Sequence, residues 1–155
     1  PKIYYGDEVG MWGADDPHCR KPMVWDDLTF DNETFDHKSG FGKGFGTYTV
    51  KQNKELLEYY KKLINFRNSN EVLLYGDIDF TLIDDKNESF AFTRTFKDET
   101  VLSVFNTGKD ELRYLLPFDT EDINLEVVVP ENASLSNDEL KYIIIPPGET
   151  FIIKY

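Results

Sequence analysis

From Glu71 onward, the chain consists of short segments with strand propensity, and none of them shows a helical period. The segments are rich in β-branched and aromatic residues, and turn residues such as Asn106-Thr107-Gly108 and Pro146-Pro147-Gly148 separate them. Short strands at this spacing predict an antiparallel β-sandwich over residues 71–155. The predicted strands are Val72–Tyr75, Phe80–Ile83, Phe90–Phe96, Thr100–Phe105, Leu112–Leu116, Leu125–Val129, Lys141–Ile145 and Phe151–Lys154.

Residues 1–70 have a different pattern, with one short strand, a long loop and one helix. Ile3, Tyr4 and Tyr5 form a continuous apolar run, which is typical of a strand buried on both faces in a parallel sheet. Apolar residues then recur at helical spacing between Leu56 and Ile64, and Thr49 is expected to cap this helix because Gln52 follows it at capping-box spacing.

A single strand followed by a single helix cannot bury both of its faces alone. We therefore expect residues 1–70 to dock onto the sandwich or to associate between molecules. The chain opens with Pro1-Lys2 and no initiator Met, and an apolar run follows almost at once. We expect it to be a piece of a longer protein whose targeting information is missing, so the sequence leaves the compartment open.

The charge of the chain argues against two classes of partner. Its 155 residues carry a formal net charge of −12. Nucleic acid and anionic membrane both require a cationic surface, so neither is expected as a partner, whereas a neutral ligand such as a sugar is compatible. The single cysteine, Cys19, excludes an internal disulfide, and no apolar run approaches the roughly 20 residues of a membrane span.

The most specific motif lies near the beginning of the chain. It reads Tyr4-Tyr5-Gly6-Asp7-Glu8, then Gly10-Met11-Trp12-Gly13, Asp16-Pro17-His18-Cys19-Arg20 and Lys21-Pro22-Met23-Val24-Trp25. This pattern resembles the segment that closes the (β/α)₈ barrel of α-amylase superfamily (family 13-type) glycoside hydrolases, and it is most similar to the cyclomaltodextrinase and neopullulanase branch. The following helix resembles the last barrel helix of that family, and the β-rich remainder resembles its C-terminal domain.

The resemblance implies a C-terminal fragment with two parts. Residues 1–70 would be the end of the catalytic barrel, with its last strand, an active-site loop and the last helix, and residues 71–155 would be the β-sandwich domain. Loops that follow barrel strands line the catalytic face. In the family, the Asp and Arg at the positions of Asp16 and Arg20 contact glucose units on the non-reducing side of the cleaved bond. We carry that substrate-binding role over to these two residues, and the alternative is an ion pair that stiffens the loop.

The resemblance also implies a reaction that this chain cannot perform alone. The family cleaves α-glucosidic bonds with retention, through an Asp nucleophile, a Glu acid/base and a second Asp that stabilises the transition state. These residues lie on earlier barrel strands, and a whole barrel takes about 250 residues. None of their motifs occurs here, so the chain should be inactive although its full-length parent degrades maltooligosaccharides, cyclodextrins or starch-type substrates. No cofactor is expected.

Several other residues have a less specific chemistry. Trp12, Phe41 and Phe45 are aromatic and could stack on sugar, but such side chains more often pack beneath a loop. The adjacent Asp7 and Glu8 cannot flank one bond from a strand, because neighbouring strand residues point to opposite faces. His18 and Cys19 hint at a metal, yet so few His and Cys residues make a site improbable, and none is expected.

Two alternatives to the enzyme-fragment hypothesis remain for the β-rich half. It could be a starch- or oligosaccharide-binding module without catalysis, or a structural domain that covers an apolar flank of the barrel. Residues 71–155 contain no Trp, and their Phe and Leu content is typical of a core. The sequence therefore favours the structural role.

Overall fold

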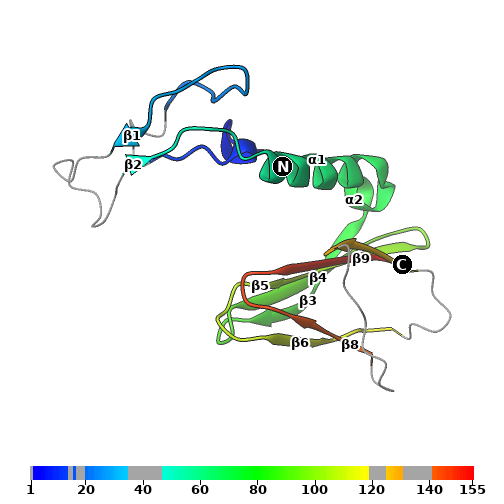
Figure 1. The fold of residues 1–155 in the computed structure, drawn as a ribbon. Helices are drawn as coiled ribbons and strands as arrows, with labels where there is room; N and C mark the ends of the chain where they lie inside the picture. Colours follow the sequence, from blue (N-terminus) through cyan, green and yellow to red (C-terminus); the bar gives the residue numbers. More distant parts are fainter. Residues whose placement is uncertain (1, 14–15, 17–19, 35–46, 119–124, 131–140) are drawn as a thin grey trace. The chain divides into compact units, whose positions relative to one another are not determined.

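The computed structural model describes residues 2–13, 16, 20–34, 47–118, 125–130 and 141–155. The chain divides into two compact units, residues 1–66 and residues 67–155, which are described separately below (Figure 1). No helix in these described ranges is long and apolar enough to cross a membrane.

The first unit contains little regular structure apart from its helix. Its elements are the 3₁₀ turn η1 (Asp7–Val9), the two-residue strands β1 (Glu33–Thr34) and β2 (Thr47–Tyr48), which pair antiparallel, and α1 (Lys54–Ser69), which runs on into the second unit.

The N-terminal end of α1 differs from the prediction. The helix begins at Lys54, and the side-chain oxygen of Asn53 accepts a hydrogen bond of 3.0 Å from the backbone N–H of Leu56. This is the geometry of an N-cap residue that satisfies the third helical amide. The expected Thr49 cap is wrong, because Asn53 provides the cap four residues later. The backbone N–H of Asn53 also donates to the carbonyl of Val9 at 2.9 Å, which fixes the chain where the helix starts.

The predicted strand at Ile3–Tyr5 is also wrong for this structure. These residues adopt no strand, and their side chains are 45%, 54% and 42% exposed. An extended segment becomes a strand only by bonding to a neighbouring strand, and a parallel-barrel strand requires one on each side. No described segment of this chain pairs with it.

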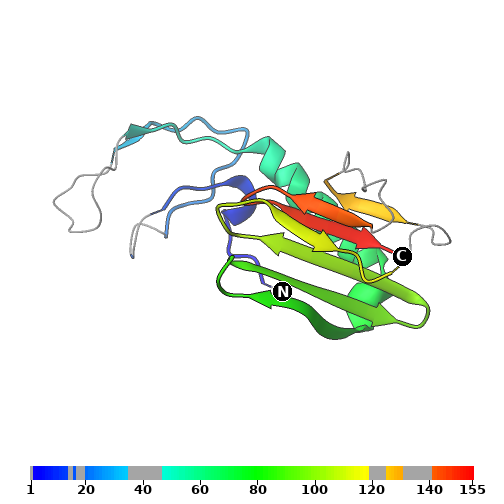
Figure 2. The same ribbon diagram turned by 90° about the horizontal axis from the view of Figure 1, so that it is seen from below.

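The second unit consists of two antiparallel sheets (Figure 1 and Figure 2). The larger sheet has the order β3-β4-β5-β9-β7, and β6 pairs with β8 in the smaller one. The prediction of an antiparallel β domain is confirmed. The strands are β3 (Asp77–Asp84), β4 (Ser89–Phe96), β5 (Glu99–Asn106), β6 (Leu112–Leu115), β7 (Glu126–Val129), β8 (Tyr142–Ile145) and β9 (Thr150–Lys154).

The core of this unit lies between the two sheets. On β4 the core-facing residue is the small Ala91, whereas Phe90 and Phe92 lie on the opposite face and stack on Phe105 at centroid distances of 4.5 and 5.8 Å. The buried core consists of Ala91, Leu102, Val104, Phe151 and Ile153 from the larger sheet, with Tyr114, Leu116, Ile143 and Ile145 from the smaller sheet and its flank.

The predicted strand Val72–Tyr75 is instead a short helix, α2 (Glu71–Tyr75), that packs against β4 and β5. A four-residue apolar run fits one helical turn as well as a strand. Here the turn is favoured because it buries Val72 completely and lets the Arg67 guanidinium bind the carbonyl of Leu73. Gly76 ends the helix where there is no room for a side chain, because a Cβ there would lie 2.4 Å from the carbonyl oxygen of Val72.

Candidate functional site

The two residues predicted to bind sugar, Asp16 and Arg20, lie together in the structure. Arg20 Nε lies 2.7 Å from Asp16 Oδ1, and the terminal Arg20 Nη2 donates to Asp16 Oδ2 at 3.0 Å. This is a bidentate pair, with the planar guanidinium facing the carboxylate. Both side chains are largely in solvent, with exposed fractions of 70% for Arg20 and 54% for Asp16. The pair has no net charge, and its exposed groups can donate hydrogen bonds to a ligand and accept them from it.

A second cation, Lys21, holds the same loop from inside. Its ammonium group donates to the backbone carbonyl of Trp12 at 2.8 Å and forms an ion pair with Glu33. The Lys21 side chain is only 20% exposed, so solvent screens this ion pair less than the Asp16–Arg20 pair. In addition, the hydroxyl of Tyr5 donates to the backbone carbonyl of Lys21 at 2.7 Å. Residue 21 thus connects three separate parts of the loop directly beside Arg20.

The Trp12 ring is engaged within the loop. It stacks on Tyr48 with a centroid distance of 4.8 Å and an interplanar angle of 18°, and the Lys21 ammonium lies 4.3 Å from its centroid. The cavity beside these residues is only about 50 Å³. A water molecule takes about 30 Å³ in the liquid, so this space is too small for a sugar ring. Trp12 therefore packs the loop, as the structural alternative predicted.

Three contacts tie the loop to the beginning of α1. The carbonyl of Val9 accepts the backbone N–H of Asn53, and the side-chain amide of Gln52 donates to the carbonyl of Val24 at 2.8 Å. An exposed ion pair of 2.8 Å joins Asp26 to Lys54. Because these contacts are spread over residues 9–26, a rigid helix supports the segment that bears Asp16 and Arg20.

The adjacent carboxylates Asp7 and Glu8 lie in η1 and not in a strand. Glu8 accepts the backbone N–H of Gly6 at 2.9 Å, a bond that Gly6 makes at a positive φ of 96°. The Glu8 carboxylate therefore has a local structural role. Among the residues that the structure describes, no cluster of three or more His, Cys, Asp or Glu side chains is arranged to hold a metal ion.

The remaining candidates, Phe41, Phe45, His18 and Cys19, lie outside the described residues. Sequence reasoning missed Lys21, because its partner Glu33 is twelve residues away and no local pattern links the two. The one indication of its role in the sequence was that Lys21 directly follows Arg20.

Comparison with known proteins places the chain in a family. No family model matches the chain. It is 32% identical over 147 residues to a cyclomaltodextrinase of Geobacillus thermopakistaniensis, a match that covers 95% of this chain and 21% of that enzyme. It is also 34% identical over 116 residues to neopullulanase 2 of Thermoactinomyces vulgaris, covering 75% of this chain and 16% of that protein. The chain thus spans about a fifth of the length of such relatives.

Solved structures agree with the sequence relatives. An α-amylase of Geobacillus thermoleovorans superposes with a TM-score of 0.65 at 21% identity, over 97% of this chain and 28% of that one. At this identity the superposition shows a shared fold, while the sequence matches show descent. The chain therefore belongs to the α-amylase superfamily of glycoside hydrolases and corresponds to the C-terminal region of its longer members.

Proposed function

We propose that the chain is the C-terminal part of an α-glucan hydrolase that cleaves α-1,4-glucosidic bonds with retention. The names of the relatives, cyclomaltodextrinase and neopullulanase, support a maltooligosaccharide, cyclodextrin or starch-type substrate for the full-length enzyme. In this proposal residues 1–70 form the end of the catalytic barrel, and residues 71–155 form the C-terminal β domain.

Asp16 and Arg20 are proposed to contact the substrate. A carboxylate accepts hydrogen bonds from sugar hydroxyls, and a guanidinium donates to them, so an exposed pair of the two suits a neutral polyhydroxylated ligand. The observation that carries this proposal is their bidentate geometry on a loop fixed from inside by Lys21 and by the start of α1. A site of this kind binds best when its groups are held in place before the ligand arrives.

The opening segment Ile3–Tyr5 is proposed to become a barrel strand only beside its neighbours. Its three exposed apolar side chains favour pairing with another chain when those neighbours are missing. We expect the isolated chain to self-associate through this segment. Light scattering tests this directly, and a monomer at high concentration would contradict it.

The isolated chain should have no hydrolase activity, because the nucleophile and acid/base of the proposed mechanism would belong to other barrel strands. The test is to incubate the purified chain with β-cyclodextrin and maltotriose and to measure reducing ends. Turnover above background would overturn this part of the proposal.

The substrate-binding role is tested in a chimera. The matched region of the Geobacillus thermopakistaniensis cyclomaltodextrinase is replaced by this chain, and the kcat/KM of the chimera is measured on β-cyclodextrin. Asp16→Ala or Arg20→Ala removes a charged hydrogen-bonding group worth about 1.5–3 kcal/mol, so kcat/KM should fall roughly 10- to 100-fold. Asp26→Ala is the matched control, because it breaks an equally exposed ion pair of the same loop.

Two results would count against the proposal. An active chimera in which Asp16→Ala and Arg20→Ala behave like Asp26→Ala would restrict the pair to a structural role. A correctly folded chimera without any activity would contradict the assignment of the chain to this part of the enzyme.

A further inference from the structure

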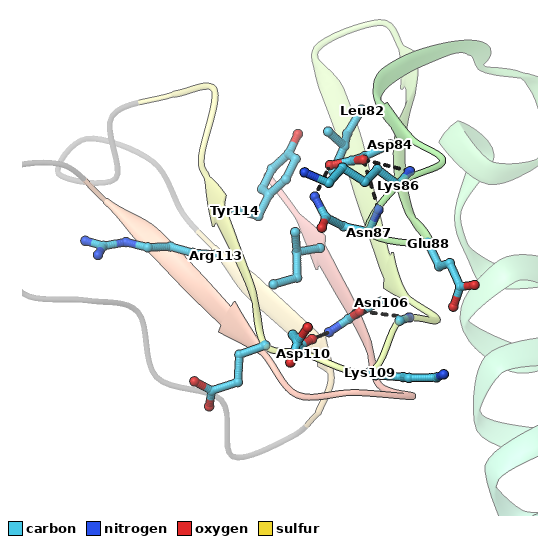
Figure 3. A pocket seen from close by; sticks show the side chains of 13 residues that line it. Leu82, Asp84, Lys86, Asn87, Glu88, Asn106, Lys109, Asp110, Arg113 and Tyr114 are labelled. Atoms are coloured by element: carbon cyan, nitrogen blue, oxygen red, sulfur yellow. Dashed lines mark hydrogen bonds between the residues drawn. The ribbon is translucent and has the colours of Figure 1, made fainter.

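The second unit contains a hollow of about 590 Å³, which no role proposed above involves (Figure 3). It opens between the β3–β4 turn, the loop joining β5 to β6, and β6 itself. Its volume falls within the range of about 300–1,000 Å³ that is usual for small-molecule sites. All of its lining residues lie in the described part of the chain.

One wall of the hollow is a rigid turn built around Asp84. The Asp84 carboxylate accepts the side-chain amide of Asn87 at 2.6 Å and the backbone N–H groups of Lys86 and Asn87 at 3.1 Å each. These bonds, led by the one from the Asn87 side chain, hold the pKa of Asp84 below its ordinary value. The Asp84 carboxylate thus already binds three groups of the turn, so this wall of the hollow keeps its shape without a ligand.

The opposite wall is fixed by Asn106, which is only 1% exposed. Its side-chain amide donates to the carbonyls of Asp110 and Ile145 at 2.9 and 2.8 Å, and its oxygen accepts the N–H of Gly108 at 3.1 Å. These three bonds set the course of the β5–β6 loop. Both walls are therefore formed before any ligand binds.

The side chains at the opening combine apolar surface with charges of both signs. Figure 3 shows Lys86 reaching from the turn toward Tyr114, with Leu82 beside it, while Arg113 and Lys109 point away. Asp110 lies beside Asn106 on the other wall. The Lys86 ammonium is attracted by the nearby Asp84 carboxylate, but neither it nor the Asp110 carboxylate forms a salt bridge or a side-chain hydrogen bond with the described residues.

A buried hydroxyl, that of Ser89, lies between two residues that line the hollow, although Ser89 itself does not line it. Ser89 pairs with Asp84 on one side and with Asn106 on the other, so the three residues form a row across β3, β4 and β5. Ser89 is 4% exposed, and its Oγ has no hydrogen-bond partner among the described residues. A buried hydroxyl without a partner is unfavourable, so a water molecule that reached Ser89 would be stabilised.

These features select the class of ligand. The lining has four carboxylates, those of Asp84, Glu88, Asp110 and Glu111, against the three cations Lys86, Lys109 and Arg113, so its net charge does not favour an anion. No described cluster of His, Cys, Asp or Glu side chains is arranged to hold a metal ion. A sugar has an apolar C–H face and hydroxyls that both donate and accept, which matches the apolar surface of Leu82, Leu112 and Tyr114 set among side chains of both charges. We propose that the hollow binds a short neutral α-glucan, as a site formed entirely by the β domain.

The test is an NMR titration of the complete 155-residue chain with maltotetraose, following backbone amide shifts. The expected result is a saturable shift below about 10 mM ligand, the affinity range of weak sugar sites. The amides that shift should be those of the two walls, namely Lys86, Asn87, Gly108 and Lys109. The use of α-linked glucose rests on the function proposed above, but this titration needs no catalysis, so its failure is distinguishable from failure of the chimera.

Variants locate the binding. Lys86→Ala and Asp110→Ala should each raise the Kd about tenfold, the effect of losing one hydrogen bond to a charged group. Asp98→Ala, in the exposed β4–β5 turn away from the hollow, should leave the Kd unchanged. The inference is overturned by the absence of a saturable shift, by shifts that avoid both walls, by equal binding of inorganic phosphate, or by variants that bind like Asp98→Ala.

Discussion

Asn106→Ala should destabilise the second unit more than any other single change to a polar side chain of that unit. The substitution removes three hydrogen bonds of 2.8–3.1 Å and leaves the carbonyl of Ile145, a core residue, without its side-chain donor. Each such bond contributes about 1 kcal/mol net, and an unsatisfied buried group costs a further amount of similar size. We expect the free energy of unfolding to fall by about 3–4 kcal/mol.

The measurement must report on this unit alone. Urea unfolding followed through the NMR signals of the Ile143, Ile145 and Ile153 methyl groups does so, because all three side chains lie in its core. Asn87→Ala is the matched control: it also removes an Asn side-chain hydrogen bond, but an exposed one, and should cost less than about 1 kcal/mol. A loss below about 1 kcal/mol for Asn106→Ala would refute the claim that this side chain organises the β5–β6 loop.

Three further predictions concern other parts of the chain. Gly76→Ala forces a methyl group against backbone atoms and should lower the free energy of unfolding by about 3 kcal/mol in the same titration. Gly148→Ala meets open space and should lower it by about 1 kcal/mol, because of its φ of +77°. Equal losses for the two variants would contradict this. Because the folded pKa of Asp84 is depressed below its ordinary 3.8, its contribution to stability is present above that pH and is lost as the pH falls through the folded value. Asp84→Asn should therefore flatten the acid limb of the stability profile below about pH 4, and superimposable acid limbs would argue against it. Lys21→Met should lower the stability of the first unit by about 1–2 kcal/mol, read from the urea midpoint of Trp emission, since both tryptophans lie there. An unchanged midpoint would show that the partly buried Lys21 ammonium does not hold the loop.

The β domain was predictable because its signals are local. Alternation along Phe90–Phe96 and turn residues such as Asn106-Thr107-Gly108 mark strands without knowledge of their partners. Two apolar runs were misassigned because a short apolar run does not determine which segment it will pair or pack with. Val72 forms a helical turn that fits against β4 and β5, and Ile3–Tyr5 stays irregular where no described strand pairs with it.

The candidate site shows the same difference between local contacts, which the sequence predicts, and long-range contacts, which it does not. Asp16 and Arg20 are four residues apart, so their pairing was within reach of sequence reasoning, and the structure brings them together. The contacts that support this pair were not predictable from the sequence, because Lys21 bonds to Trp12 and Glu33, nine and twelve positions away. Asn106 was likewise read only as a turn residue, although its side chain reaches Ile145, 39 residues further on. Contacts of this kind depend on the folded arrangement and leave no periodic trace.

The assignment of residues 1–70 to a barrel end and of residues 71–155 to a separate C-terminal domain remains a prediction. The central claim about function is that Asp16 and Arg20 belong to a sugar-binding wall. The most direct measurement is a crystal structure of the chimera soaked with acarbose, the compound complexed with the Geobacillus thermoleovorans α-amylase. The account predicts the Asp16 carboxylate and the Arg20 guanidinium within about 3.2 Å of inhibitor hydroxyls. A bound inhibitor with Asp16 and Arg20 still paired only to each other, and out of hydrogen-bonding reach of the sugar, would contradict it.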